Sequence, residues 1–262
     1  MTVFRHEMKQ NLRTALIWAL GCAVLLLITM SVFPRVKDSV GMVEKLIEGM
    51  GPLARAFAMD KLDYGTVMGY YATQSDAITS LAGGLFAAIL ASAMLVKEES
   101  RHTAEYLFPH PVSRLWVLVQ KFLAILLLLA VFVAVNAGLS LLSFRFLGES
   151  WDRKDFIEIQ LALYILMVCM ACLCWAISAF LSRESLGLGI GLALLMYFLN
   201  LLINLEVGID ALRFITPYHF TQAADLVGPL GIRQNMLQQW ALISGGLTLI
   251  GCARYMAKDL RI

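Results

Sequence analysis

The chain has 262 residues, of which 60% are hydrophobic and only 15% are charged, and its net charge is +2. Soluble domains carry about 25% charged residues, so this composition excludes an ordinary soluble protein, and the nearly balanced charge points to no nucleic-acid partner. Several apolar runs reach the length of about 20 residues that crosses the hydrocarbon core as a helix. The predicted fold is an all-α polytopic membrane protein, with residues 1–262 in a single transmembrane domain.

Residues 1–14 precede the first apolar run and have an amphipathic pattern. Phe4, Met8 and Leu12 recur every four residues, which places them on one face of a helix, and polar residues occupy the rest. This pattern predicts an interfacial helix that lies along the cytoplasmic membrane surface before the chain turns into the first span. No cleavage site of small residues follows, so we expect a retained span and not a removed signal peptide.

Hydropathy predicts six spans, at residues 15–33, 77–96, 122–147, 157–181, 186–205 and 240–257. Basic residues gather on one side of these spans: Arg5, Lys9, Arg13, Lys97, Arg101, Arg114, Lys121, Arg183, Arg254, Lys258 and Arg261. Loops rich in Lys and Arg remain in the cytoplasm. Both termini and residues 97–121 are therefore expected to be cytoplasmic, with 34–76 and 206–239 external.

The two external segments also carry helical patterns. Between residues 42 and 57, apolar residues recur at helical spacing, and Gly51-Pro52 should divide them into two short helices. These helices either cap the external mouth or lie on the membrane surface. In 206–239, apolar residues around Thr216-Pro217 and Gly228-Pro229 predict partial burial as a re-entrant turn.

Motifs for covalent chemistry or ATP binding are missing from the sequence. No glycine is followed by lysine, so the phosphate-binding loop G-x-x-x-x-G-K-[ST] is absent. All five cysteines lie in apolar runs and all four histidines lie outside the predicted spans, which predicts neither a catalytic nor a metal site. The apolar cores contain no Asp or Glu, and Asp76 and Glu206 sit at outer span ends. Coupled transporters usually bury such residues, so we expect energy from another subunit.

Small residues at four-residue spacing form ridges where helices can approach closely. The candidate packing residues are Gly83, Gly84, Ala87, Ala88, Gly187 and Gly191. These residues are compatible with tight packing inside one subunit. They are equally compatible with an interface that moves or that joins two subunits. The main polar side chains within the spans are Asn136, Ser140, Ser143, Asn200 and Asn204, and four of them, Asn136, Ser140, Asn200 and Asn204, are candidates for a translocation path. The simpler interpretation of these polar residues is that they form hydrogen bonds between helices. The more specific interpretation is that they line a translocation path.

Residues 97–121, here called the docking segment, join spans two and three. Thr103–Phe108 is predicted to form a short helix, which Pro109 ends. Its apolar face and charged rim suit insertion into a groove on a soluble partner. The candidate docking residues are Glu98, Glu99, Arg101, Thr103, Glu105, Leu107, Phe108 and Arg114.

The chain resembles the permease subunits of type-2 ABC exporters, which have six spans and a separate ATPase chain. The matching residues are Glu98-Glu99, Thr103, Glu105, Leu107, Pro111-Val112-Ser113-Arg114, Lys121, Gly69-Tyr70, Thr216-Pro217-Tyr218 and Lys258-Asp259-Leu260, whereas His102 and Phe108-Pro109-His110 depart from the family pattern. The resemblance implies that the helix in the docking segment is a coupling helix, which sits on the nucleotide-binding subunit. It also implies that ATP and Mg bind that partner, and that a second permease copy or a homologous permease completes a transporter in the bacterial plasma (inner) membrane.

Three functions follow from these observations. The first is a transport subunit without enzymatic activity of its own, which exports a lipid, peptide or drug. The second is a non-transporting anchor or sensor that docks a cytoplasmic partner. The third is an intramembrane protease, because Glu98-Glu99 begins a Glu-Glu-x-x-x-Arg motif, although Thr103 stands where Arg is required.

Overall fold

The computed structural model describes residues 2–100, 113–181, 185–205, 213–228, 231 and 234–258. These residues form helices and connecting turns, with no strand among them. Six helices have the length and hydropathy to cross a membrane: Val3–Asp38, Val67–Lys97, Arg114–Leu147, Arg153–Ser178, Leu186–Asn204 and Gln234–Ala257. The predicted all-α polytopic fold with six spans is confirmed.

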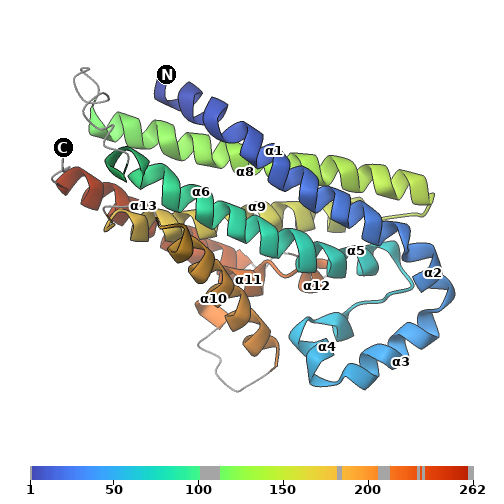
Figure 1. The fold of residues 1–262 in the computed structure, drawn as a ribbon. Helices are drawn as coiled ribbons and strands as arrows, with labels where there is room; N and C mark the ends of the chain where they lie inside the picture. Colours follow the sequence, from blue (N-terminus) through green and yellow to red (C-terminus); the bar gives the residue numbers. More distant parts are fainter. Residues whose placement is uncertain are drawn as a thin grey trace.

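In chain order, the described helices are α1 (Thr2–Ser31), α2 (Phe33–Asp38), α3 (Val40–Met50), α4 (Pro52–Ala56), η1 (Met59–Lys61), α5 (Val67–Ser75), the π-helix η2 (Asp76–Ser80), α6 (Leu81–Ser100), α8 (Arg114–Leu147), α9 (Arg153–Ser178), α10 (Leu186–Asn204), α11 (Pro217–Phe220), α12 (Ala223–Leu226) and α13 (Gln234–Ala257). α1 begins, α6 ends, α8 begins and α13 ends at one end of the bundle (Figure 1). We call this the docking end, because the docking segment joins α6 to α8 there.

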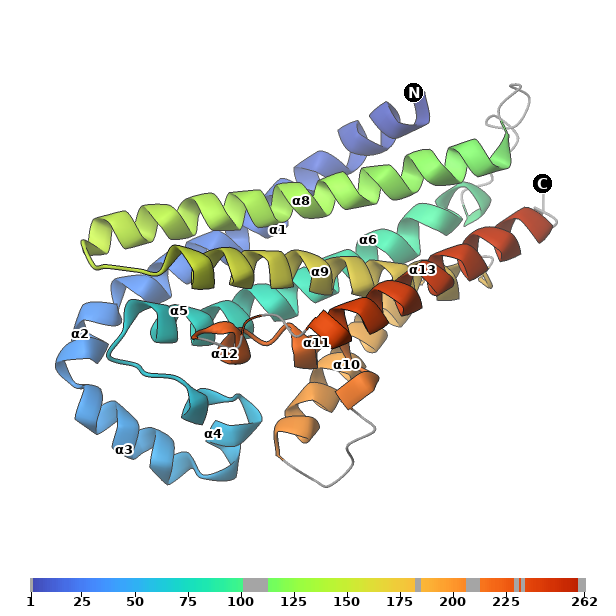
Figure 2. The same ribbon diagram turned by 180° about the vertical axis from the view of Figure 1, so that it is seen from behind.

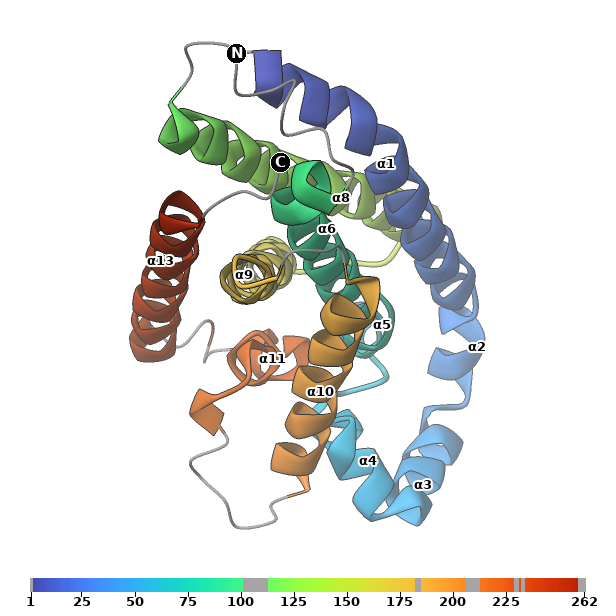
Figure 3. The ribbon, with the colours of Figure 1, turned by 60° about the vertical axis from the view of Figure 1, so that its left-hand side comes forward.

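α6 and α9 form the centre of the bundle, with the other spans around them (Figure 3). Within the most apolar stretch of the second span and of the fourth, 67% of the residues are buried. In the corresponding stretches of the other four spans, only 17–33% are buried. Trp175 of α9 is fully buried, and its ring lies 5.6 Å from that of Phe122. The outer faces of α1, α10 and α13 remain apolar and exposed in the single chain, as expected for surfaces that meet lipid or another subunit.

The expectation of a separate interfacial helix over residues 1–14 is wrong in one respect. α1 runs unbroken from Thr2 to Ser31, so the chain does not turn before the first span. No Gly or Pro precedes Gly21 to interrupt the helix. The predicted apolar face is present, but Phe4, Met8 and Leu12 pack against the protein core.

The third and fourth spans begin at Arg114 and Arg153, before the predicted starts at residues 122 and 157. A polar side chain that caps the first turn extends each helix towards its N-terminus. Ser113 accepts a hydrogen bond from the Trp116 amide (3.3 Å) and starts α8. Asp152 accepts one from the Lys154 amide (2.7 Å) and starts α9. Such caps satisfy amides of the first turn that have no partner within the helix.

The two short helices predicted around Gly51-Pro52 are confirmed as α3 and α4. Gly51 has a positive φ of 53°, and Pro52 occupies the first position of α4. α3 has no buried residue and stands away from the spans, whereas α4 faces α10 (Figure 1).

The predicted burial of the segment before the last span is also confirmed. α11 and α12 lie against the bundle, beside α9 and α5 (Figure 2). The side chains from Thr216 to Ala224 are all buried. The described part of this segment therefore lies within the bundle, and its re-entrant path through the membrane stays a prediction.

Candidate functional site

Buried polar contacts join three helices at the docking end. The Lys97 ammonium group of α6 donates to the Glu7 carboxylate and to Gln10 Oε1 (2.9 Å), both on α1. Glu7 is 1% exposed and Lys97 9% exposed. A buried charge is tolerated only when it is paired, so this contact holds α1 against the end of α6.

α8 joins the same group of contacts from the other side of the docking segment. The Lys121 ammonium group, 1% exposed, donates to the Met94 carbonyl oxygen of α6 (2.7 Å). The Phe4 amide of α1 donates to Gln120 Oε1 (3.1 Å). We call the set Glu7, Gln10, Lys97, Gln120 and Lys121 the polar clamp. It links α1, α6 and α8 on both sides of residues 101–112.

Arg114 connects the docking segment to two further helices. Its guanidinium group donates to the Lys258 carbonyl oxygen, just beyond α13, at 3.1 Å. Lys258 in turn donates from its ammonium group to the Leu181 carbonyl oxygen, just beyond α9. A displacement of the docking segment would therefore reach five helices through hydrogen bonds and not through packing alone.

Most predicted docking residues lie outside the part of the chain that the structure describes. Glu98 and Glu99 belong to the last turn of α6, but their side chains are not described, and Arg101, Thr103, Glu105, Leu107 and Phe108 lie outside the described residues. The predicted coupling helix stays a prediction. The polar clamp was not among the features that the sequence patterns predicted. The only sequence signal for the polar clamp was the presence of charged residues at the borders of apolar runs. Those residues were used only to predict the orientation of the spans in the membrane.

The four polar residues proposed for a translocation path separate into two groups. Asn136 and Ser140 are each 1% exposed. Ser140 donates to the Asn136 carbonyl oxygen (2.7 Å) and accepts from the Tyr71 hydroxyl (3.2 Å). Tyr71 also accepts from Gln160 Nε2 of α9 (2.7 Å). This pair therefore contributes to a buried network between α5, α8 and α9.

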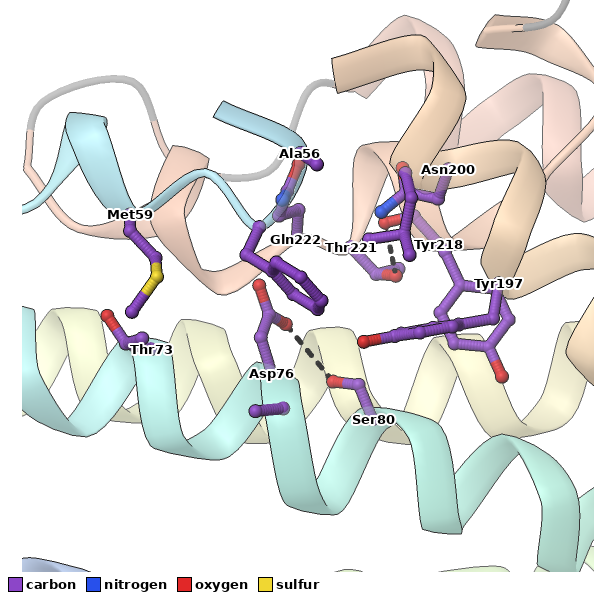
Figure 4. A pocket seen from close by; sticks show the side chains of 13 residues that line it. Ala56, Met59, Thr73, Asp76, Ser80, Tyr197, Asn200, Tyr218, Thr221 and Gln222 are labelled. Atoms are coloured by element: carbon purple, nitrogen blue, oxygen red, sulfur yellow. Dashed lines mark hydrogen bonds between the residues drawn. The ribbon is translucent and has the colours of Figure 1, made fainter. Parts of the chain in front are cut away.

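Asn200 and Asn204 of α10 lie elsewhere. Asn204 donates from Nδ2 to the Ala56 carbonyl oxygen (2.9 Å), which attaches α4 to α10. Asn200 lines a cavity of about 80 Å³ enclosed by α10, α4, α5, η2 and the segment around α11. We call it the Asp76 cavity (Figure 4), after the acidic residue in its wall.

Asp76 owes its position to a local change of helix type. Hydropathy predicted that it lies at an outer span end, but it lies inside a helix that continues unbroken from Val67 to Ser100. Residues 76–80 form one π-helical turn, which inserts an extra residue and is frequent at functional sites. The carboxylate accepts from the Ser80 hydroxyl (3.1 Å) and from the Ala223 amide (2.9 Å). Figure 4 shows the contact with Ser80. The bond from the Ala223 amide holds the start of α12 against the span.

The predicted small-residue ridge of the second span is densely packed. Ala87 and Ala88 are fully buried. A methyl group added to Gly84 would lie 1.9 Å from the Tyr218 hydroxyl oxygen, and one added to Gly83 would lie 3.2 Å from the sulfur of Met167. A methyl group at Gly84 would therefore force the Tyr218 side chain to move, whereas one at Gly83 would require only a small shift of Met167.

The glycine ridge predicted in the fifth span, Gly187 and Gly191, does not pack against another described helix of the subunit, so this reading of the ridge is wrong. A methyl group at Gly187 or Gly191 would meet no described atom within 4 Å, and both residues are exposed. α10 instead turns Gly189 towards α6, where an added methyl group would lie 2.9 Å from the Ser92 hydroxyl and 3.0 Å from the Ala88 carbonyl oxygen. The buried residues of α10 recur at helical spacing on one face: Gly189, Ala193, Met196, Asn200 and Ile203. This spacing is the sequence signal that could have identified Gly189 as the packing glycine.

A protein-family model described as "ABC-2 family transporter protein" matches residues 1–244. The match includes the polar clamp, the docking segment and the Asp76 cavity. Comparison with curated protein sequences finds no significant match.

Proposed function

The chain belongs to the ABC-2 family of transporter proteins, as a permease subunit of an ABC transporter, and we propose that it serves an exporter. In this proposal a separate ATPase subunit binds ATP and Mg and docks on residues 97–121. The chain performs no covalent chemistry and passes the movement of the ATPase to its spans. The observation that carries the proposal is the polar clamp, because it attaches both ends of the docking segment to three spans.

Movement of the docking segment acts on the spans through these contacts. When the ATPase pair closes, it pushes the ends of α6 and α8 together. Lys97 carries the push to α1 through Glu7, and Arg114 carries it towards α13 through the Lys258 carbonyl oxygen. Such rigid-body shifts of packed helices are one of the ordinary forms of a switching transition. The permease thereby alternates between cytoplasm-open and outward-open packings.

Two cavities on the surface of the second span mark the ends of the proposed substrate path. One, of about 120 Å³, lies between α1 and α6 near the polar clamp, and its wall includes Gln10, Thr14 and Trp18. The other is the Asp76 cavity, which includes Asn200. Of the four polar candidates, we retain Asn200 for the path. The mixed apolar and polar walls suit an amphipathic lipid, peptide or drug.

A second permease copy, or a homologous permease, completes the proposed transporter, and each permease carries its own ATPase subunit. The exposed apolar face of α10, with Leu195 and Phe198 and the open glycines Gly187 and Gly191, supports a surface that meets another helix or lipid. We place the assembly in the bacterial plasma membrane with both termini in the cytoplasm, as the distribution of basic residues predicts.

The proposal is tested by capture of the ATPase from native membranes in mild detergent. The tagged chain is compared with the double variant Leu107→Asp, Phe108→Asp. Leu46→Asp is the matched control, because it introduces the same charge on an exposed apolar position of α3, at 61% exposure and far from the docking end.

We expect an ATPase with a phosphate-binding loop to accompany the wild-type chain and the control, and to be lost from the double variant. Substrate-dependent stimulation of that ATPase in vesicles would then demonstrate transport. A stable wild-type chain that retains no ATPase would contradict the proposal. Retention of an ATPase that no substrate stimulates would favour an anchor or sensor.

A further inference from the structure

The walls of the Asp76 cavity are rich in hydrogen-bond acceptors. An ionised carboxylate offers about four acceptor positions. Hydrogen bonds from Ser80 and from the Ala223 amide use two of them, and the Ala224 amide also contacts the carboxylate. Two amide side chains also line the cavity, those of Asn200 and Gln222, which are 6% and 4% exposed. Among the described residues, neither amide oxygen has a hydrogen-bond donor. The hydroxyl groups of Tyr197 and Tyr218 also line the cavity and can donate, and that of Tyr218 has no partner among the described residues. The unsatisfied groups nevertheless include two amide oxygens, which a ligand with N–H donors would satisfy.

Asp76 has no cationic partner in the described part of this site. Among the described residues, no Lys, Arg or His lies within salt-bridge distance of Asp76. The nearby ammonium group of Lys61 is engaged by Asp225 at 2.8 Å. Buried acceptors without donors are costly, and a carboxylate without a cation adds to that cost. A ligand that brings both positive charge and N–H donors would remove both costs.

The remaining walls determine which kind of cation fits. Phe57, Met59, Leu201 and the ring of Tyr197 supply apolar and aromatic surface (Figure 4). Aromatic rings attract organic cations, whereas hard metal ions require a shell of six or more oxygen ligands. A primary ammonium group has three donors, which matches the three acceptor side chains. An attached alkyl group would contact the apolar wall.

From this arrangement we propose that the Asp76 cavity binds the protonated amine of an organic ligand. Asp76 supplies the charge, and Asn200 and Gln222 supply the additional acceptors. The proposal concerns binding alone, so it does not depend on the direction of transport or on the ATPase. If the chain exports its ligand, cationic amphiphiles are the substrate class to examine first.

The test measures binding to the purified full chain in detergent by thermal unfolding during a titration. The probe is n-propylammonium chloride, and n-propanol is the matched uncharged compound. Sodium chloride at equal ionic strength controls for salt. The variants are Asp76→Asn, which keeps an acceptor for the Ala223 amide but removes the charge, and Asn200→Ala. Asp60→Asn is the control, because it removes an exposed carboxylate that does not line the cavity.

We expect propylammonium to raise the Tm of the wild-type chain and of Asp60→Asn, while propanol and sodium chloride do not. The apparent Kd should rise by about tenfold or more in Asp76→Asn, and tenfold corresponds to about 1.4 kcal/mol. A smaller increase is expected in Asn200→Ala.

Equal shifts with propanol, equal shifts with sodium chloride, or unchanged affinity in Asp76→Asn would each overturn the proposal. If Asp76→Asn fails to fold, two measurements still test the proposal. They are the comparison of the three solutes on the wild-type chain and the titration of Asn200→Ala. Because no ATPase is present, failure of this test leaves the proposed exporter function standing. Failure of ATPase capture likewise leaves the binding result standing.

Discussion

Lys97, at the end of α6, donates a buried hydrogen bond to the carboxylate of Glu7 in α1, across 90 positions of sequence. Lys97 is the first residue of the docking segment, and Glu7 contacts it from α1. The same ion pair therefore stabilises the fold and connects α1 to the segment on which the ATPase is proposed to act. The first prediction follows from this double role.

Removal of one partner of this pair should be strongly destabilising. Glu7→Ala leaves a charged lysine buried without its counter-ion, and such changes typically cost about 3–5 kcal/mol. The double variant Glu7→Leu, Lys97→Met should recover much of the loss, because it leaves no unpaired charge. Thermal or denaturant unfolding in detergent measures both effects.

The control for this prediction is the exposed ion pair between Lys37 and Glu149, whose side chains are 44% and 35% exposed. Lys37→Met should lower the free energy of unfolding by less than about 1 kcal/mol, as is usual for exposed pairs. Similar losses for Glu7→Ala and Lys37→Met would contradict the assigned burial of the clamp.

Gly84→Ala should destabilise the protein although alanine is the better helix former. An alanine in an open helix position stabilises by roughly 0.5–1 kcal/mol, but here its methyl group meets the Tyr218 hydroxyl at 1.9 Å. Overpacking of this kind typically costs about 1–3 kcal/mol. Tyr218→Phe should relieve part of the loss, and a double-mutant cycle measures the coupling.

Gly187→Ala is the matched control, because no described atom lies within 4 Å of its added methyl group. In the isolated chain it should be neutral or slightly stabilising. If Gly84→Ala were equally harmless, Tyr218 could not lie against Gly84 as described.

Tyr71→Phe should weaken the contact between α5, α8 and α9. The change removes the hydroxyl that accepts from Gln160 (2.7 Å) and donates to Ser140 (3.2 Å), and it leaves buried polar groups without a partner. The expected loss of unfolding free energy is about 1–3 kcal/mol. Tyr164→Phe removes a single, longer bond to the Leu126 carbonyl oxygen (3.3 Å) and should cost less. The reverse order of the two losses would argue against the network.

Tyr64 should make stability depend on alkaline pH. Burial raises the pKa of its hydroxyl above the ordinary value of 10.0, because the charged form is poorly solvated. A raised folded-state pKa favours the protonated form, so this contribution is complete below pH 10 and declines as the pH rises above it. Tyr64→Phe should flatten the decline in unfolding free energy between about pH 9.5 and pH 11. An unchanged slope would show that the hydroxyl is not buried.

Sequence patterns predicted some packing surfaces well and others poorly. The ridge at Gly83 and Gly84 lies in a central span, where any face meets a neighbour, so four-residue spacing sufficed to predict burial. α10 lies at the edge of the bundle and buries one face only. Spacing cannot choose between the face of Gly187 and the face of Gly189, because the choice depends on how the helix is rotated against α6.

The N-terminal segment shows a similar limit. An amphipathic pattern is the same for a helix on a membrane surface and for a helix on a protein surface. The pairing of Glu7 with Lys97 decides between them, and it requires that the end of α6 lies beside α1.

The sequence by itself determined the membrane class, the number of spans and the two short helices around Gly51-Pro52. These features depend on transfer free energies and backbone preferences that sum over neighbouring residues. Only the tertiary structure decided that Asp76 meets the Ala223 amide, 147 positions away, and that Asn200 shares their cavity. Partner choice between distant polar residues depends on helix rotation and on the path of the chain through α11 and α12, and no local pattern in the chain encodes either.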